Sequence, residues 1–234
     1  MVGDLHGAFH LLVSAMRMVK FDKAVDRILS VGDLIDRGQD SGRVLEFLEQ
    51  HFVFAIRGNH EEHFIRTSID NLRLFARVNR HGLGWLSELD TSHIEEIQHR
   101  LLRLPIVMEV QTDSGVVGLV HADIPKGMDW KTFVELVASG CTKTCHTAQN
   151  GRLRIENNDC TGIDGIDRVF VGHSVMKDGP ARFGNVYAID TGAVYYTHPE
   201  EQGSLTLVRI NGNAFEADSG FAPMEQKTTG QYLK

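Results

Sequence analysis

Short apolar segments that run into glycine-containing polar motifs most constrain how this chain can fold. "RILSV" (27–31) runs directly into Gly32-Asp33, and "FVFAI" (52–56) runs into "RGNH" (57–60). Segments of this length and composition, bounded by glycine, are typical of buried strands. Apolar residues recur at helical spacing before and after the first strand, over 8–20 and 42–50. This strand–helix–strand alternation predicts a layered α/β fold.

The stretch 62–104 is mostly helical in its apolar spacing and rich in polar residues, with an interruption at "HGLGW" (81–85). We expect this stretch to form a helical cap. Pro105 marks its end. Beyond it, "IVMEV" (106–110) and "VVGLV" (116–120) predict a β-hairpin with a loop of about five residues.

The second half of the chain is less regular. The stretch 123–165 has weak periodicity and many polar residues, which predicts a long surface loop with one helix. Three further strands are predicted, at "DRVFV" (167–171), "VYAID" (186–190) and "LTLVRI" (205–210). We therefore expect one domain over 1–210, followed by a polar, partly disordered tail over 211–234.

The composition argues against several classes of protein. With 234 residues, the chain is long enough for one domain with a sizeable core. Its net charge of −7 argues against a nucleic-acid binder or a membrane-surface binder. No apolar run approaches the length of a membrane span. The three cysteines favour a reducing cytoplasm over a disulfide framework. Since Cys141, Cys145 and His146 match no common zinc spacing, we expect no metal there.

Four predicted strands end at a residue that can bind a metal: Asp33, Asn59, His121 and His173. Ligands of open α/β sheets bind beyond the carboxyl ends of the strands, so these residues are expected to converge. The set contains carboxylate, imidazole and amide groups and no thiolate. This donor chemistry suits Mn²⁺, Fe or Zn²⁺.

The motif that contributes Asp4 and His6 begins at Val2, only one residue into the chain. A strand that presents these two side chains therefore has almost no residues of its own here. We expect the natural start to lie upstream, with an apolar strand ahead of Val2.

Together the polar motifs spell an ordered family pattern that spans the chain from Val2 to about Ile210. The motifs are "GDLHG" (3–7), "GDLIDRG" (32–38), "RGNHE" (57–61), "VHAD" (120–123), "GHS" (172–174) and "IDTGAV" (189–194). This pattern resembles the metal-dependent phosphoprotein phosphatases, most closely their compact bacterial and phage members. The resemblance implies a calcineurin-like metallophosphoesterase fold: a layered β-sandwich flanked by helices, with the metal site at the C-terminal ends of the strands.

The resemblance also implies two divalent metal ions, with Mn²⁺ first and Fe or Zn²⁺ as alternatives. Asp4 and His6 would bind the first ion, and Asp33 would bridge both ions. The second ion would be completed by Asn59, His121 and His173. A hydroxide that bridges the two metals would then attack phosphorus in line with the leaving group.

Several further residues receive roles from the same resemblance. His60 would be the general acid, oriented by Asp36. Arg37 would bind the phosphoryl oxygens, with Arg152 as the second clamp and Arg154 as the alternative choice. For Arg57 we consider both contact with the phosphate and a structural salt bridge.

The implied activity is a serine/threonine phosphoprotein phosphatase that also accepts phosphotyrosine, acting on a phosphoprotein or phosphopeptide in the cytoplasm. Neither a nucleic acid nor a membrane is expected as a partner, and the oligomeric state is left open. Two alternatives remain: a symmetrical diadenosine tetraphosphate hydrolase and a non-catalytic phosphate-binding scaffold.

Overall fold

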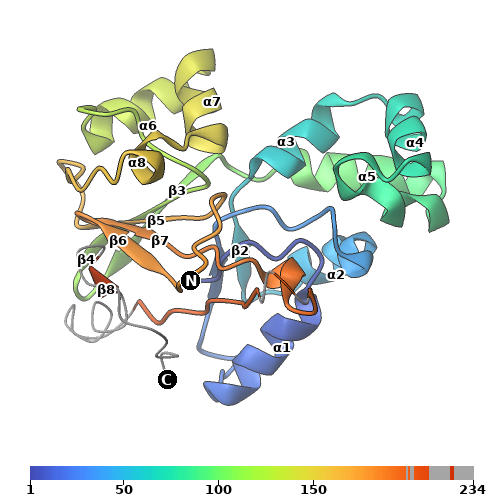
Figure 1. Ribbon diagram of the computed structural model, residues 1–234, viewed down its shortest axis with the longest axis horizontal. Coiled ribbons are helices and arrows are strands. Elements are labelled where there is room, and N and C mark those ends of the chain that lie inside the picture. Colours follow the sequence, from blue (N-terminus) through green and yellow to red (C-terminus); the bar gives the residue numbers. More distant parts are fainter. Residues whose placement is uncertain (199, 201–202, 211–221, 224–234) are drawn as a thin grey trace.

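Two β-sheets form the centre of the molecule, and helices flank them (Figure 1). The computed structural model describes residues 1–198, 200, 203–210 and 222–223. The first sheet pairs β1 (Ile28–Ser30) with β2 (Val53–Ala55) in parallel. The second sheet has the order β3-β4-β5-β7-β6-β8, with β3 at Val107–Thr112, β4 at Gly115–Val120, β5 at Arg168–Val171, β6 at Ala181–Phe183, β7 at Val186–Ala188 and β8 at Ala222–Pro223. This mixed α/β arrangement agrees with the predicted fold class.

An apolar layer joins the two sheets. Val31 and Ile56, which directly follow β1 and β2, pack with Val117, Phe170 and Tyr187 of the second sheet. Each of these five side chains is at most 1% exposed. Burial of a large apolar side chain contributes roughly 1.5–3 kcal/mol, so this layer fixes how the strand ends of the two sheets meet.

The first three residues run between strand β1 and the segment 206–208. Val2 forms one bridge to Ser30 and another to Leu207, and it is fully buried. The amino group of Met1 donates a hydrogen bond to the carbonyl of Val208, with 2.6 Å between the atoms. The segment that leads into Asp4 is therefore paired on both of its sides.

The helices predicted near the first sheet are present. The helix α1 (Phe9–Met18) falls within the predicted range 8–20, and η1 (Gln39–Arg43) and α2 (Val44–Leu48) replace a single helix over 42–50. Their apolar faces pack on the first sheet through a cluster that includes Phe9, Leu12, Ile28, Val44 and Phe47.

The stretch predicted as a helical cap contains four helical elements, at the right in Figure 1: α3 (Asn59–Arg66), α4 (Ile69–Arg77), η2 (Arg80–Glu88) and α5 (Thr91–Leu102). Side-chain caps begin two of them. Ser68 accepts a hydrogen bond from the amide of Asn71, and Asp90 accepts one from the amide of His93. The element η2 contains His81 and Gly82 with positive φ angles, which explains the helical interruption seen in the sequence.

The prediction of a long surface loop with one helix over 123–165 was wrong, because the stretch is mostly helical. This stretch contains α6 (Trp130–Ala138), α7 (Thr142–Asn150) and α8 (Leu153–Glu156), grouped beside the second sheet in Figure 1. Helix α6 is capped by Asp129 and buries Trp130 and Phe133. Helix α7 buries mainly Thr144, Ala148 and Gln149, so no apolar period reveals it.

The predicted strands of the second sheet also need corrections. The hairpin loop contains two residues rather than five, because the pairing of Thr112 with Gly115 extends both strands. Strand β6 was missed, and the predicted strand at 205–210 reduces to the single bridge of Leu207 in the described structure. Apart from 222–223, the predicted tail over 211–234 lies outside the described residues.

Candidate active site

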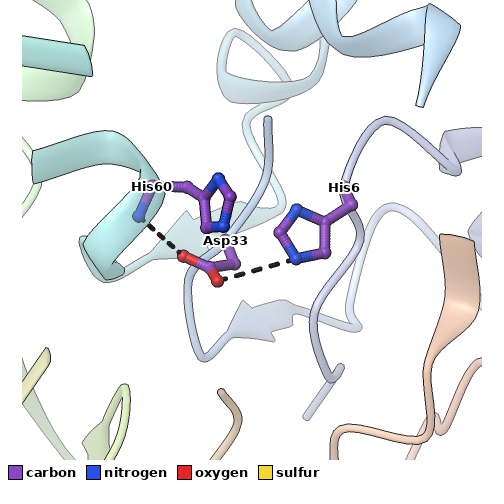
Figure 2. Close-up of side chains that lie close together, drawn as sticks. All are labelled: His6, Asp33 and His60. Atoms are coloured by element: carbon purple, nitrogen blue, oxygen red, sulfur yellow. Dashed lines mark hydrogen bonds and ion pairs between the residues drawn. The ribbon is translucent and has the colours of Figure 1, made fainter. Parts of the chain in front are cut away.

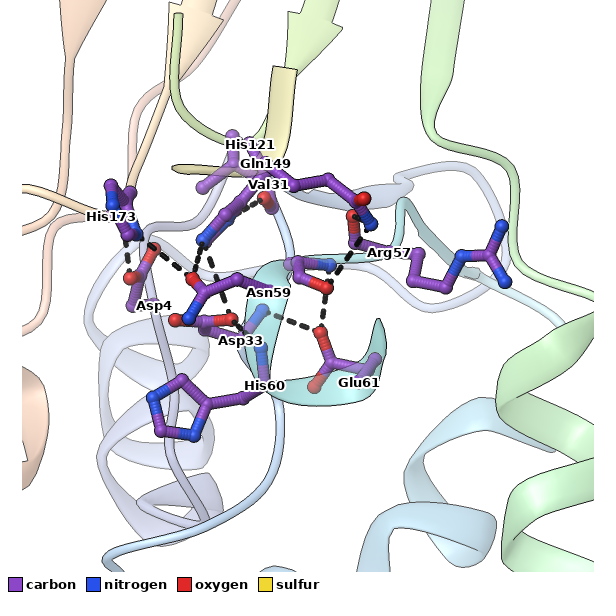
Figure 3. Close-up of polar contacts among 12 residues, drawn as sticks. Asp4, Val31, Asp33, Arg57, Asn59, His60, Glu61, His121, Gln149 and His173 are labelled. Carbon is purple, nitrogen blue, oxygen red and sulfur yellow. Dashed lines mark hydrogen bonds and ion pairs between the residues drawn. The ribbon is translucent and has the colours of Figure 1, made fainter. Parts of the chain in front are cut away.

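The polar strand ends converge as the sequence predicts. Asp33 follows β1, Asn59 begins α3 after β2, and His121 and His173 follow β4 and β5 (Figure 3). Asp33 is 2% exposed and His121 is fully buried. The loops beyond parallel strands meet at one edge of a sheet, so residues far apart in the sequence become neighbours here.

One group of side chains gathers around Asn59. Its Oδ1 lies 3.0 Å from Nε2 of His121 and 2.9 Å from Nδ1 of His173. Nε2 of His121 also lies 3.3 Å from Oδ1 of Asp33. Asp33, His121 and His173 each offer a ligand atom within 4.8 Å of the others, which is a spacing that can hold a metal ion.

A second group lies on the other side of the same carboxylate. Nε2 of His6 lies 3.6 Å from Oδ2 of Asp33, and Figure 2 shows the imidazoles of His6 and His60 both beside the Asp33 carboxylate. These three residues also offer ligand atoms within 4.8 Å of one another. The two oxygens of Asp33 therefore face two different imidazole groups.

Asp4 stands beside both groups. Its Oδ2 accepts a hydrogen bond from the backbone amide of His173, with 3.0 Å between the atoms. Its Oδ1 is buried and has no hydrogen-bond partner. Burial, followed by the charges of Asp190 and Asp33, raises the pKa of Asp4 well above its usual range. A buried carboxylate oxygen without a donor is costly unless a cation or another donor approaches it.

Backbone carbonyls set the orientation of two imidazoles. Nδ1 of His6 lies 2.7 Å from the carbonyl oxygen of Ile35, and Nδ1 of His121 lies 2.8 Å from that of Val31. Since a carbonyl only accepts, each Nδ1 carries a proton, and each Nε2 is the nitrogen that faces the site. Burial lowers the pKa of His6 to about 3, so this ring is neutral, as a metal ligand must be.

These residues fit two divalent cations that share Asp33. The donor set consists of carboxylates, imidazoles and one amide oxygen, which suits Mn²⁺, Fe or Zn²⁺. The unpaired Oδ1 of Asp4 supplies an observation independent of the motif pattern, because it is a buried acceptor that lacks a donor.

His60 and Asp36 form a dyad next to these ligands. Nδ1 of His60 lies 2.7 Å from Oδ2 of Asp36, a carboxylate with no exposed surface. Burial alone lowers the pKa of His60, but the carboxylates of Asp33 and Asp36 outweigh it, so the pKa is raised above its ordinary value. The imidazole is therefore favoured in its protonated form, with Nε2 directed away from Asp36.

The guanidinium of Arg37 touches both imidazoles at the opening of the site. Its Nη1 lies 2.7 Å from Nε2 of His6, and its Nη2 lies 3.1 Å from Nε2 of His60. The predicted phosphate clamp thus stands within reach of the predicted general acid.

The structure separates the two arginines that the sequence left as alternatives. Arg152 is exposed, donates to the hydroxyl of Ser174 at 3.1 Å, and contributes to the lowered pKa of His173, so it faces the site. Arg154 is buried and pairs with Asp123, with 2.9 Å between Nε and Oδ1. The geometry favours Arg152 as the residue able to meet a phosphate.

Arg57 adopts the salt-bridge arrangement that the sequence left open. Its Nε lies 3.2 Å from Oε2 of Glu62. In Figure 3 its guanidinium points away from the imidazoles of His121 and His173. Contact with a phosphate stays a prediction for this residue.

The sequence reasoning missed the structural importance of Glu61. Its two carboxylate oxygens accept hydrogen bonds from the backbone amides of Gly58, Asp33, Leu34 and Ile35, at 2.8–3.3 Å. Glu61 stands three residues after Gly58, at the third position of helix α3, which is the position of a capping-box glutamate. That spacing is the sequence signal that could have identified it.

Comparisons with known proteins agree with this geometry. The family model described as calcineurin-like phosphoesterase matches residues 1–177. The serine/threonine-protein phosphatase 1 of Salmonella typhimurium is 34% identical over 213 residues, which cover 89% of this chain and 90% of that protein. A symmetrical bis(5'-nucleosyl)-tetraphosphatase of Ectopseudomonas mendocina is 24% identical, covering 91% and 95%. The solved structure of a cold-active protein-tyrosine phosphatase of a Shewanella species has the same fold, with a TM-score of 0.52 at 15% identity over 89% of this chain and 74% of that one.

Glu61→Gln should destabilise the folded protein. At pH 8 the native carboxylate accepts from four backbone amides, whereas the amide group of glutamine must turn a donor toward at least one of them. The free energy of unfolding should fall by about 2–4 kcal/mol, measured by urea denaturation. The control is Glu46→Gln, which removes a carboxylate that is 63% exposed and should leave the unfolding midpoint unchanged. Equal midpoints for both variants would contradict a structural role for Glu61.

Added Mn²⁺ should stabilise the EDTA-treated protein against heat. Binding to the folded state alone contributes about 2.7 kcal/mol at a concentration 100 times Kd, which corresponds to roughly 5–10 °C in Tm for a chain of this size. Asp33→Asn should remove most of this shift, because one carboxylate serves both groups of ligands. Asp113→Asn, at an exposed turn, should keep the full shift. Absence of any shift in the parent protein would refute the cation assignment.

Proposed function

Because the chain belongs to the calcineurin-like phosphoesterase family, we propose that it is a serine/threonine phosphoprotein phosphatase that uses two divalent cations. The observation that carries the proposal is the placement of the His60–Asp36 dyad and Arg37 beside two cation-binding groups that share Asp33. The similarity to the Salmonella serine/threonine-protein phosphatase over most of both chains supports the substrate class.

The proposed ligands divide between two cations. Asp4 and His6 would hold the first, Asn59, His121 and His173 would hold the second, and Asp33 would contact both. When bound, the two ions would lower the pKa of a water molecule toward ~7 and neutralise charge on the phosphoryl oxygens. Mn²⁺ is the proposed metal, with Fe or Zn²⁺ as alternatives that the same donors accept.

His60 is proposed to protonate the leaving oxygen of a phosphoserine or phosphothreonine. Its Nδ1 is held by Asp36, so Nε2, which Nη2 of Arg37 contacts at 3.1 Å, is the nitrogen that would give the proton. The carboxylates of Asp33 and Asp36 raise the pKa of this ring above its ordinary value, which favours the protonated form. A general acid contributes most when the leaving group is a poor one, as an alkoxide is.

Two arginines are proposed to bind the phosphate from opposite edges of the site. Arg37 reaches it from the loop after β1, and Arg152 from the start of helix α8, next to Ser174. The planar guanidinium can donate two parallel hydrogen bonds to one phosphate, which fixes the orientation of the group as well as its position.

The same centre could act on other phosphate esters. Hydrolysis of phosphotyrosine is compatible with it, since an aryl leaving group needs less help from an acid. The chain is also similar to symmetrical dinucleoside tetraphosphatases: one that covers 91% of this chain is 24% identical, against 34% for the phosphatase, and another is 32% identical over 56% of this chain. A non-catalytic scaffold is disfavoured because every proposed ligand position carries a residue able to bind a cation.

A phosphoprotein or phosphopeptide is the proposed partner, and the cytoplasm the proposed location. All three cysteines are free, which agrees with a reducing environment. In the described part of the chain, no helix is both long enough and apolar enough to span a membrane.

The substrate class can be tested with one preparation of the protein. With Mn²⁺ present, it should hydrolyse a phosphoserine peptide at least tenfold faster than diadenosine tetraphosphate, measured as kcat/KM. EDTA should abolish both reactions. Cleavage of the dinucleotide alone would refute the proposal in favour of the tetraphosphatase. A protein that binds no metal and hydrolyses neither substrate would favour the scaffold.

The two arginines of the α8 region should separate activity from stability. Arg152→Ala should lower kcat/KM for a phosphopeptide roughly 10- to 100-fold, the loss of one hydrogen bond to a charged group, with an unchanged Tm. Arg154→Ala should instead lower the free energy of unfolding by about 3–5 kcal/mol, because it leaves the buried Asp123 unpaired. The reverse pattern would assign the phosphate clamp to Arg154.

A further inference from the structure

A segment of the helical cap reaches into the active site and contacts the loop that carries Asp36 and Arg37. The indole Nε1 of Trp85, in η2, donates a hydrogen bond to Oδ1 of Asp36 at 3.1 Å. The carbonyl of Gly82, three residues earlier, accepts a hydrogen bond from the amide of Arg37 at 2.8 Å. Two neighbouring residues of the site are therefore bound by one short cap segment.

The contact from Trp85 completes the hydrogen bonding of Asp36. The other oxygen of this buried carboxylate, Oδ2, faces Nδ1 of His60 at 2.7 Å. A carboxylate held at one oxygen can still rotate about its Cβ–Cγ bond, whereas one held at both oxygens has a fixed plane. The direction in which Asp36 holds the imidazole of His60 thus depends on a donor from the cap.

Trp85 is itself firmly placed. Its ring stacks on Phe64 of helix α3, with 5.6 Å between the ring centroids and 19° between the planes. Helix α3 also carries His60 near its start. The indole, Asp36 and His60 therefore form a closed chain of contacts that begins and ends on the same helix.

The backbone of this loop needs such external support. Asp36 and Arg37 have φ angles of 71° and 67°, in the left-handed region that side chains other than glycine rarely adopt. Gly82 allows the close approach, because a Cβ atom there would lie 2.4 Å from the amide nitrogen of Arg37. The cap segment that contains Gly82 and Trp85 therefore packs closely against the loop of Asp36 and Arg37.

We propose that Trp85 is a positioning residue for the phosphatase reaction: through Asp36 it aims His60 at the leaving oxygen. The inference rests on the proposed function, and it makes the cap a part of the catalytic apparatus. It predicts a defect confined to proton donation, since among the described residues the indole forms its hydrogen bond with Asp36 and its ring contact with Phe64, not with the cation ligands or the phosphate-binding arginines.

The test is Trp85→Phe, which keeps an aromatic ring against Phe64 and removes the N–H group. The value of kcat for a phosphoserine peptide should fall about tenfold, and KM should stay unchanged. The loss is smaller than the roughly 100-fold or more expected when a general acid is removed completely. The value of kcat for p-nitrophenyl phosphate, whose leaving group needs no acid, should stay within about twofold. An equal loss on both substrates, or no loss on either, would overturn the inference.

Trp130→Phe is the matched control. Trp130 is the other tryptophan of the chain, and its indole also donates to a carboxylate, that of Glu109, away from the site. This variant should keep the ratio of the two kcat values at that of the parent protein. A shifted ratio here would mean that loss of any indole donor disturbs the enzyme, which would contradict a specific role for Trp85.

Two further measurements isolate the pathway through Asp36 and His60. In a His60→Asn background, Trp85→Phe should cause no additional loss of kcat on the phosphoserine peptide. An undiminished tenfold loss would overturn the inference.

In the NMR spectrum of the metal-free protein, the resonance of the Trp85 indole N–H can be assigned by its absence from Trp85→Phe. It should shift on Asp36→Asn, while the resonance of the Trp130 indole N–H does not. An unshifted Trp85 resonance would refute the contact itself.

These outcomes distinguish the inference from the proposed function. If the parent protein with Mn²⁺ hydrolyses neither substrate, the proposed function fails, while the resonance still tests the contact. If the parent protein hydrolyses both and Trp85→Phe matches it on both, only the role of Trp85 is refuted.

Discussion

The carboxylate of Glu61 is the interaction on which the geometry of the site depends. It accepts hydrogen bonds from the amide of Gly58, after β2, and from three successive amides of the loop after β1 that begins at Asp33. Buried backbone amides must find a hydrogen-bond acceptor, and these four amides have no other acceptor among the described residues. One side chain thereby ties the ends of two adjacent strands together. Because Asp33 lies in one loop and Asn59 in the other, the tie also sets the distance between these two proposed cation ligands.

Backbone strain is concentrated in the same loops. Five residues of the proposed site have positive φ angles: His6, Asp33, Asp36, Arg37 and His173. Such conformations cost of the order of 1 kcal/mol or more for residues other than glycine and persist only when the surroundings fix them. The fixing contacts are found here as hydrogen bonds to Glu61, to the carbonyl of Gly82 and to the carboxylate of Asp4. Because of these strained turns, side chains from short loops point toward the proposed cation site.

The sequence predicted the centre of this arrangement better than its supports. Asp33, Asn59, His121 and His173 were found because each follows an apolar strand, a pattern that depends only on local sequence. Strand β6 and helix α7 were missed. The sequence of β6, Ala-Arg-Phe, contains no apolar run, and α7 buries small or polar side chains. The contacts of Glu61 with the loop after β1 and of Trp85 with Asp36 join residues 26–49 positions apart, and no local period encodes such pairs. Likewise, the choice of Arg152 over Arg154 as the proposed phosphate clamp depends on tertiary packing, because Arg154 forms an ion pair with Asp123.

The distribution of charge across the site explains how an acidic protein can bind an anion. The buried carboxylates of Asp4, Asp33 and Asp190 lie deep, where their mutual repulsion favours the approach of cations. Arg37 and Arg152 lie toward the opening, and both contribute to the electrostatics of the buried groups. A phosphate ester therefore meets positive groups on both sides, the proposed cations below and the guanidinium groups at the rim. Since nearby charges dominate at a site of low dielectric, the net charge of −7 does not oppose this binding.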